Sequence, residues 1–344
     1  MRHHDDGALR PALRKCEEGR VGAIDVLVLE DGRPAAADAV RPEAPAAGAL
    51  GDAGGEPPVS SPSVLLALGD RTHDLSTRAL VMGILNRTTD SFFDDGAYFS
   101  LDALLARAEE LVAAGADLLD VGGVKAGPGP EVTEAEELDR VVPAIAALRA
   151  RFDLPLSVDT WRASVATAAY AAGAVVGNDI SGFADPGYLP AAATAGATVV
   201  ATHIRLGPRI PDPEPVYADV VADVRRFLLE RARAAAAAGI PQGRIIVDAG
   251  LDLGKTWQQS LELLRRSREL ADLGHPLLLS ASNKTFLGRL LDLEVGARRE
   301  ASHAAHAVGI IGGCRILRAH DVLGARRTAD VLAAVLERRV GADA

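Results

Sequence analysis

The sequence is poor in cysteine and in positive charge. Its 344 residues include only two cysteines, Cys16 and Cys314. So few thiols exclude a disulfide-stapled fold, and we expect both to be free thiols in a reducing compartment. Acidic residues outnumber basic ones, which gives a formal net charge of −10. This acidity argues against nucleic acid or an anionic membrane as a general partner.

Long apolar runs are also missing. No uninterrupted apolar stretch approaches the roughly 18 residues that a membrane span needs. The first residues, MRHHDDG, are charged and lack the apolar core of a secretory signal. We therefore expect a cytoplasmic protein with no membrane segment. The composition, 48% hydrophobic and 24% charged, is typical of a globular chain, and its length suits one barrel-sized domain plus an appendage.

Residues 1–62 differ in composition from the rest of the chain. Proline, alanine, glycine and acidic residues dominate from Gly32 to Pro62. Such a segment cannot bury enough apolar surface to offset its ordering entropy, so we predict a disordered N-terminal tail. Only the stretch AIDVLVLEDG (23–32) has strand character within it. The remaining residues, 63–344, are predicted to form one domain.

Short apolar runs alternate with helix-like stretches from residue 79 onwards. The eight runs are 79–86, 117–123, 154–160, 174–179, 198–203, 244–250, 276–284 and 314–321. Helical periodicity covers 101–116, 133–152, 162–174, 185–197, 216–239, 257–274, 297–313 and 325–340. Continuous apolar runs of this length are typical of parallel strands buried on both faces. Eight such units predict a closed (β/α)8 TIM barrel, whose lower end is covered by a lead-in strand pair at 64–78.

Each apolar run ends in a polar residue. These residues are Asn86, Asp120, Asp159, Asn178, His203, Asp248, Lys284 and the pair Arg318 and His320. The active sites of such barrels lie at the carboxyl ends of the strands, so these side chains are the candidate ring. Carboxylates and amides that converge can form paired hydrogen bonds to a flat heterocycle with adjacent N–H and amino groups. The cations come from the last two strands, where these barrels usually bind phosphate.

The loop after the first barrel strand offers oxygen ligands. Asn86 precedes Asp90 and Ser91, and their oxygens suit Mg²⁺ bound to a pyrophosphate. Plainer roles stay open, because a strand-end aspartate can simply cap the next helix. His303 and His306 form an HxxH pattern among alanines, and we interpret them as structural rather than as a zinc site.

Seven motifs resemble those of dihydropteroate synthases in order and spacing. They are MGILNRTTDSF (82–92), GADLLDVGG (115–123), SVDT (157–160), NDISG (178–182), VDAGLDLGKT (247–256), SNKTFLG (282–288) and LRAHDV (317–322). The resemblance covers about residues 64–340 and implies the same barrel fold. That family joins 6-hydroxymethyl-7,8-dihydropterin pyrophosphate to p-aminobenzoate in folate biosynthesis, and releases pyrophosphate with Mg²⁺ as cofactor.

The resemblance also implies a role for each matched residue. The pterin pocket would consist of Asp120, Asp159, Asn178, Asp248 and Lys284. Pyrophosphate would be bound by Asn86, Arg318 and His320, with Asn86 also the Mg²⁺ ligand. Asp248, Lys284, Arg318 and His320 would be catalytic, with Asp248 stabilising positive charge in the pterin ring. By the same resemblance, the protein would form a homodimer through its last helices.

Several loop motifs depart from the family pattern. The segment 122–129 reads GGVKAGPG where the family usually has GGESTRPG, so Ala126 and Gly127 replace a Thr-Arg pair that organises the catalytic loop and the anion. Leu253 stands where an aromatic residue would flank the arylamine, and Asn283 replaces an arginine. Lys125 and Arg87 are the neighbouring cations that can compensate.

These departures resemble the divergent second paralogue of actinobacteria and leave two functions open. One is a transferase that uses p-aminobenzoate or a related amine. The other is a catalytically impaired pterin-binding paralogue with a regulatory or other role. A third reaction, methyl transfer from a methylated folate, is disfavoured because the two cysteines provide no zinc–thiolate centre.

Overall fold

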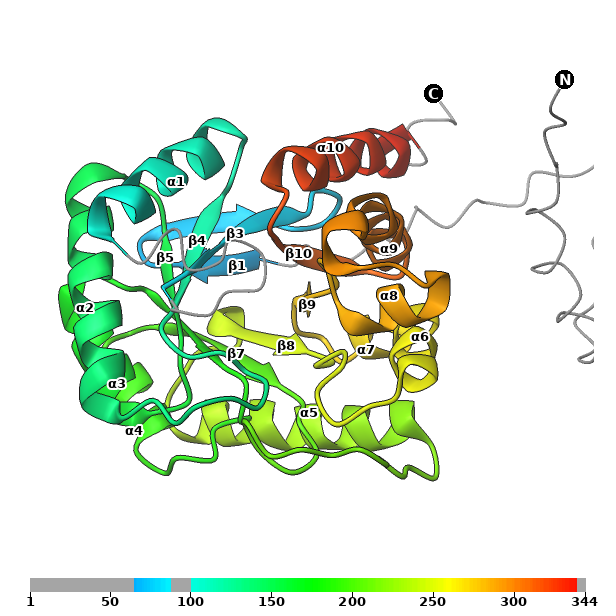
Figure 1. The fold of residues 1–344 in the computed structure, drawn as a ribbon, viewed down its shortest axis with the longest axis horizontal. Coiled ribbons are helices and arrows are strands. Elements are labelled where there is room, and N and C mark those ends of the chain that lie inside the picture. The colour runs from blue at the N-terminus through cyan, green and yellow to red at the C-terminus, as the bar shows by residue number, and fades with distance from the viewer. Residues whose placement is uncertain (1–64, 88–99, 339–344) are drawn as a thin grey trace, which may run out of the picture. The chain divides into compact units, whose positions relative to one another are not determined.

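The computed structural model describes residues 65–87 and 100–338. Within these residues, eight parallel strands close into a barrel in the order β10-β3-β4-β5-β6-β7-β8-β9 (Figure 1). The strands are β3 (Leu80–Asn86), β4 (Leu118–Gly122), β5 (Leu156–Asp159), β6 (Val176–Asp179), β7 (Thr198–Thr202), β8 (Ile245–Asp248), β9 (Leu277–Leu279) and β10 (Cys314–Ala319). Each lies inside one of the predicted apolar runs, so the predicted (β/α)8 barrel is confirmed.

Alternate residues of each strand point into the barrel. The apolar ones form a buried interior cluster that includes Leu80, Met82, Leu118, Val176, Val200, Ile246, Leu278 and Ile316. The same alternation, continued towards the carboxyl ends, reaches Asn86, Asp120, Asn178, Asp248 and Arg318. The strand pattern therefore places a ring of polar side chains directly above an apolar core.

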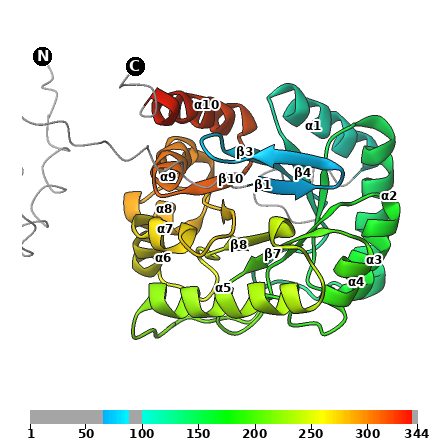
Figure 2. The same ribbon diagram turned by 180° about the vertical axis from the view of Figure 1, so that it is seen from behind.

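The predicted lead-in pair is an antiparallel hairpin of β1 (Leu65–Leu68) and β2 (Arg71–Asp74). Its side chains Leu66 and Leu68 are almost completely buried and belong to the interior cluster of the barrel. Burial of a leucine contributes about 1.5–3 kcal/mol, so the hairpin is firmly held. Arg244 donates a hydrogen bond to the Gly69 carbonyl at 2.7 Å. Both views show β1 beside β3, and the hairpin covers the amino-terminal end of the barrel (Figures 1 and 2).

Helices surround the strands. They are α1 (Leu101–Ala113), α2 (Glu134–Arg151), α3 (Ala163–Ala172), α4 (Tyr188–Thr194), α5 (Val220–Ala237), α6 (Trp257–Arg265), α7 (Ser267–Ala271), α8 (Thr285–Leu291), α9 (Arg299–Ile311) and α10 (Val322–Arg338). Two short 3-10 helices, Gln242–Arg244 and Val295–Ala297, lie in connecting loops. The predicted capping box at Thr133 and Glu136 begins α2 and is confirmed.

Several helix boundaries differ from the predicted ones; α4 and α5, for example, begin three and four residues later than expected, at Tyr188 and Val220. The single helix predicted over 257–274 breaks at Arg266 into α6 and α7. The Ser267 hydroxyl donates to the Leu264 carbonyl at 2.7 Å, and such back-bonding bends helices. Helix α8 was not predicted, because seven residues are too few to display a helical period. Helix α10 begins three residues earlier than expected, at Val322.

Some predicted features lie outside the described residues. They are the tail at 1–62 with its strand-like stretch 23–32, and the loop residues Asp90 and Ser91. In the described ranges, 65–87 and 100–338, no helix is long and apolar enough to cross a membrane.

Candidate active site

The polar ends of neighbouring strands lie in register at one rim of the barrel. Asn86 of β3 is level with Gly122 of β4. Gly122 is level with Asp159 of β5, which in turn is level with Asn178 of β6. Asp248 of β8 is level with Thr202 of β7. Because all of these strands are parallel, the candidate residues meet at the carboxyl-terminal mouth of the barrel, where such folds hold their active sites.

Asp120 is the buried centre of this arrangement. The Asp120 carboxylate accepts hydrogen bonds from the Ser157 hydroxyl at 2.6 Å and from the Asn178 amide at 3.1 Å. It also accepts one from Nε of Arg318 at 2.6 Å. Three donors satisfy a carboxylate that no water reaches, so the charge is stable there. Asp120 therefore fixes the orientation of Asn178 and Arg318.

Arg318 joins two carboxylates across the barrel. While its Nε binds Asp120, its Nη2 donates to Asp159 at 2.7 Å. Burial raises the pKa of Asp159 from its usual 3.8 to about 7, although Arg318 opposes the shift and Asp120 adds to it. Asp159 thus gains or loses a proton near neutral pH. The guanidinium predicted to bind pyrophosphate lies here between the carboxylates predicted to bind the pterin.

Asp248 lies at the end of β8 and is 5% exposed. Its Oδ1 accepts a hydrogen bond from the Gly250 amide at 2.8 Å. Burial raises the pKa of Asp248, and the Gly250 hydrogen bond and the charge of Lys284 act in the opposite direction. The Lys284 ammonium donates to the Leu251 carbonyl at 3.1 Å, so the loop after β8 positions both side chains.

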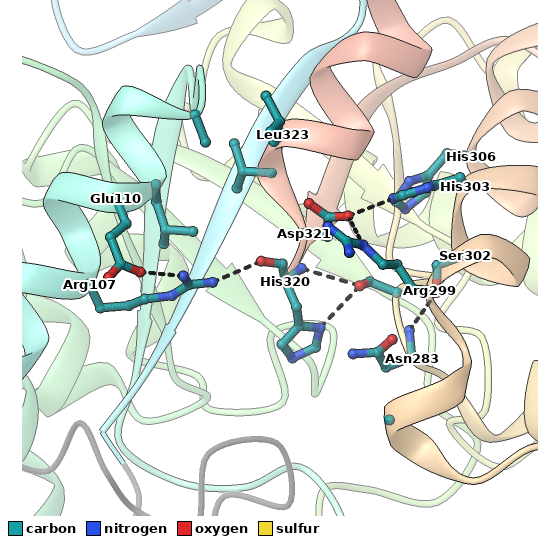
Figure 3. Close-up of a pocket in the computed structure, with 15 residues that line it drawn as sticks. Arg107, Glu110, Asn283, Arg299, Ser302, His303, His306, His320, Asp321 and Leu323 are labelled. Atoms are coloured by element: carbon teal, nitrogen blue, oxygen red, sulfur yellow. Dashed lines mark hydrogen bonds and ion pairs between the residues drawn. The ribbon is translucent and has the colours of Figure 1, made fainter.

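His320 is held from two sides. Its ring Nδ1 lies 3.1 Å from the Ser282 hydroxyl, and its backbone amide donates to the same oxygen at 3.2 Å. Arg107 of α1 donates to the His320 carbonyl at 3.1 Å (Figure 3). Burial, aided by Arg318, lowers the pKa of His320 to about 3. The imidazole is therefore neutral at physiological pH.

Gly122 creates space between two side chains at the rim. A Cβ atom at this position would lie 3.6 Å from Oδ1 of Asn86 and 3.6 Å from Oδ2 of Asp159. Because Gly122 has no side chain, these two oxygens both face the end of β4. Oxygen ligands from one or two side chains, completed by substrate phosphates and water, are the usual setting for Mg²⁺.

Lys255 and His203 form a second buried cluster, to which the sequence analysis gave no role. The Lys255 ammonium lies 2.9 Å from Nδ1 of His203 and donates to the carbonyls of Gly250 and Leu253 at 2.8 and 2.9 Å. Burial lowers the pKa of Lys255 to about 7 and that of His203 to about 3. Lys255 fixes the loop after β8 and so supports Asp248. The GKT motif and the strand-terminal histidine were the visible signals.

Arg87 and Lys125, the two cations that can compensate for the missing loop arginine, have different surroundings. The Arg87 guanidinium donates to the Arg140 carbonyl of α2 at 2.6 Å, so it contacts the helix flanking the mouth. The carbonyl of Lys125 accepts a hydrogen bond from Arg209 at 3.3 Å. Lys125 therefore lies in a loop that is held by a residue far along the chain.

His303 and His306 line the same cavity as His320 and Ser282. This cavity of about 710 Å³ lies between α1, α9 and the start of α10 (Figure 3). Nε2 of His303 is 3.1 Å from Oδ2 of Asp321. Burial lowers the pKa of His306 to about 4, which leaves its ring neutral. In the described part of the chain, no three histidine, cysteine or acidic side chains form a group that could hold a metal ion.

The fold and the ring of polar side chains define a pterin-binding barrel enzyme. A profile of the family described as pterin binding enzyme matches residues 82–320, from within β3 to just beyond β10.

Within this class, the chain belongs to the dihydropteroate synthase family. It is 40% identical over 263 residues to the dihydropteroate synthase of Bacillus subtilis, which covers 76% of this chain and 90% of that protein. It is 43% identical over 266 residues to inactive dihydropteroate synthase 2 of Mycobacterium leprae, which covers 75% of this chain and 91% of that protein. Relatives named dihydropteroate synthase and relatives named inactive dihydropteroate synthase 2 thus match this chain over similar lengths at similar identity.

Solved structures agree with the fold. The Yersinia pestis dihydropteroate synthase with a sulfonamide drug complex superposes with a TM-score of 0.76 at 39% identity, covering 80% of this chain and 99% of that one. The Xanthomonas albilineans dihydropteroate synthase with 4-aminobenzoic acid has a TM-score of 0.73 at 40% identity, covering 80% and 98%.

Proposed function

We propose that this protein is a dihydropteroate synthase-type transferase of folate biosynthesis. It would condense 6-hydroxymethyl-7,8-dihydropterin pyrophosphate with p-aminobenzoate or a related amine. The observation that carries the proposal is the set Asp159, Asn178 and Asp248, which meets at one mouth of the barrel. The 40% identity to the Bacillus subtilis synthase supports the same reaction.

The pterin would bind across the ring of strand ends. The amide of Asn178 is oriented by Asp120, so its oxygen and second N–H are available to the heterocycle. The Asp248 carboxylate can accept hydrogen bonds from the pterin amino and N–H groups. Asp159, with its pKa of about 7, can match either a donor or an acceptor on the ligand. Lys284 adds a donor from the opposite side.

The reaction breaks the bond between the pterin methylene carbon and the pyrophosphate oxygen, and the electron pair leaves with pyrophosphate. The methylene cation is delocalised into the pterin ring, and the Asp248 carboxylate stabilises that charge. The amine nitrogen then attacks the carbon and releases a proton. The new C–N bond completes the product.

His320 would assist the departing pyrophosphate as a neutral hydrogen-bond donor. The Ser282 oxygen accepts from the His320 amide and can donate its own hydrogen to Nδ1. In that arrangement the single ring proton resides on Nε2, the nitrogen that would donate to the pyrophosphate oxygens. Arg318 supplies a permanent positive charge at the same side of the ring.

The donor set at Asn86 fits a magnesium ion. The Asn86 amide oxygen is a hard ligand at the rim of the barrel, and the substrate phosphates and water would supply the other ligands. When bound, Mg²⁺ neutralises charge on the leaving pyrophosphate. Asn86 is the residue that we propose to hold it.

One observation favours a second function. The GGVKAGPG loop lacks the arginine of the family pattern, and the 43% identical Mycobacterium leprae relative is named inactive. Loss of a charge-stabilising donor typically costs about 10²–10³ in rate. A pterin-binding paralogue with a regulatory or other role is therefore the alternative.

Two measurements separate these functions. The first follows pyrophosphate release from the dihydropterin pyrophosphate with Mg²⁺ and p-aminobenzoate. The second measures binding of the pterin by calorimetry. Turnover supports the transferase, and pterin binding without turnover with any arylamine supports the paralogue. Absence of binding rejects both functions.

We further propose that the protein is a homodimer through α9 and α10. These helices pack side by side, and Val308, Ile311, Val331 and Val335 are each 48–66% exposed on them. Val331 and Val335 are one helical turn apart and share a face. Light scattering would report a dimer for the wild type and a monomer for Val331→Lys. The cytoplasmic location expected from the sequence stays a prediction.

A further inference from the structure

A segment between β7 and α5 touches the divergent loop that follows β4. Arg209, in this segment, has a φ of +63°, a left-handed conformation that is uncommon outside glycine. Its backbone amide donates to the Ala126 carbonyl at 3.2 Å. The guanidinium donates to the carbonyls of Lys125 at 3.3 Å and of Gly129 at 2.6 Å, and also to that of Pro130. One arginine thus binds four backbone carbonyls between residues 125 and 130.

The loop after β4 is held by contacts with residues of other elements. It contains no helix or strand between β4 and α2. Its ends are held by Arg140, which donates to the Gly123 carbonyl at 3.0 Å, and by Arg162, which donates to the Val132 carbonyl at 2.8 Å. Between these ends, Arg209 donates hydrogen bonds to the backbone carbonyls of Lys125, Ala126, Gly129 and Pro130. Because Arg209 recognises backbone atoms, its contacts do not depend on which side chains the loop carries.

The segment that carries Arg209 is itself anchored on the opposite side of the mouth. The Tyr217 hydroxyl donates to the Gly254 carbonyl at 2.7 Å, and Gln259 donates to the Pro215 carbonyl at 3.1 Å. Gly254 belongs to the loop after β8, which carries Leu253. The segment that carries Arg209 therefore connects the loop after β4 to the loop after β8, and the sequences of both loops depart from the family pattern.

We propose that Arg209 is a positioning residue for the second substrate: it orders the loop at 125–130 in place of the arginine that the loop itself lacks. The ordered loop would present Lys125 and complete the arylamine side of the mouth. This inference rests on the proposed transferase function. The pterin side is independent of Arg209, since Asp120, Asn178 and Asp248 come from strand ends.

Hydrogen–deuterium exchange on the full chain, without substrates, tests the ordering. In Arg209→Ala, we expect exchange of backbone amides across 123–131 to rise at least about tenfold, because the loop loses the three hydrogen bonds that the guanidinium donates to its carbonyls. Arg209→Lys, which has one nitrogen instead of a planar fork, should give an intermediate rise. Arg205→Ala is the matched control, since Arg205 pairs with Asp212 inside the same segment and makes no contact with 125–130 that the structure records. Unchanged exchange in Arg209→Ala, or an equal rise in Arg205→Ala, overturns the inference.

Kinetics and binding test the positioning. We expect Arg209→Ala to raise KM for p-aminobenzoate about tenfold while calorimetric affinity for the pterin changes less than twofold. A weakened pterin affinity of the same size, or a looser loop with unchanged KM and kcat, would refute a role confined to the second substrate. If the wild type shows no turnover, the proposed function fails. The exchange experiment then still decides whether Arg209 orders the loop.

Discussion

The two halves of the mouth are built in different ways. On the pterin side, the side chains come from strand ends, and parallel register alone sets them level with each other. On the arylamine side, the described contacts are single side chains such as Arg209 that bind loop backbone across about 80 residues of sequence. Strand register holds many residues at once, whereas a loop depends on a few anchors. The first half can therefore keep its chemistry while the second half diverges.

Loss of the Asp120 charge should give the largest effect. Asp120→Ala leaves the Ser157 and Asn178 donors and the Arg318 guanidinium without their shared partner. Removing one member of a buried ion pair typically costs about 3–5 kcal/mol of the free energy of unfolding. Urea denaturation measures this loss. Asp153→Ala is the control, because Asp153 forms its ion pair with Arg71 at the surface and should lose far less. Equal losses in the two variants would contradict the prediction.

The Asp159 titration should appear as a pH-dependent difference in stability. Its pKa lies at 3.8 when exposed and about 7 in the fold, so from pH 4 to 7 the folded protein retains a proton that the unfolded chain has lost. Stability therefore falls as pH rises through this window. Each unit of pKa difference corresponds to about 1.4 kcal/mol. The titration of Asp159 can therefore change the free energy of unfolding by at most about 4 kcal/mol.

Asp159→Asn removes this titration. Relative to the wild type, the variant should become more stable between pH 4 and 7, and the difference should be constant above pH 7. Thermal or urea unfolding at a series of pH values measures it. A difference that does not vary with pH would show that Asp159 titrates normally.

On the chemical step, Asp248→Asn should lower kcat about 10²–10³-fold, because the amide cannot stabilise positive charge in the pterin ring. Asp252→Asn is the matched control. The Asp252 carboxylate accepts from the amide of Thr285 at 2.6 Å, and an asparagine oxygen can accept the same hydrogen bond. Steady-state assays of pyrophosphate release compare the two. A similar kcat for both variants would argue against a role for the Asp248 charge.

Ser282→Ala should have a smaller effect, about tenfold in kcat, because His320 keeps its place on β10 but loses the partner that orients its ring. Ser267→Ala removes another buried hydroxyl, which bonds to two backbone carbonyls of α6 and to the Cys314 thiol rather than to His320. The comparison separates orientation of the imidazole from general loss of a buried hydrogen bond. Equal activity in both variants would show that His320 does not need Ser282.

Much of the fold could be predicted because it follows from short-range patterns. Eight apolar runs give eight strands, and inward alternation along them places Asp120, Asn178 and Asp248 in one ring. The capping box at Thr133 was visible for the same reason, since its partners are three residues apart.

The loop contacts could not be predicted in this way. The partners of Arg209 are 79–84 positions away and are backbone carbonyls, which carry no signature in the sequence. The sequence analysis did not predict that Arg318 bridges Asp120 and Asp159. The direction in which this long side chain points depends on the residues that surround it in the fold, and these cannot be read from the sequence.

The hairpin of β1 and β2 covers the amino-terminal end of the barrel, where Leu66 and Leu68 pack into the apolar interior. Under the proposed function, both substrates would therefore enter, and both products would leave, through the carboxyl-terminal mouth. We predict that excess arylamine obstructs entry of the pterin, which steady-state rates at rising p-aminobenzoate concentration would report as substrate inhibition.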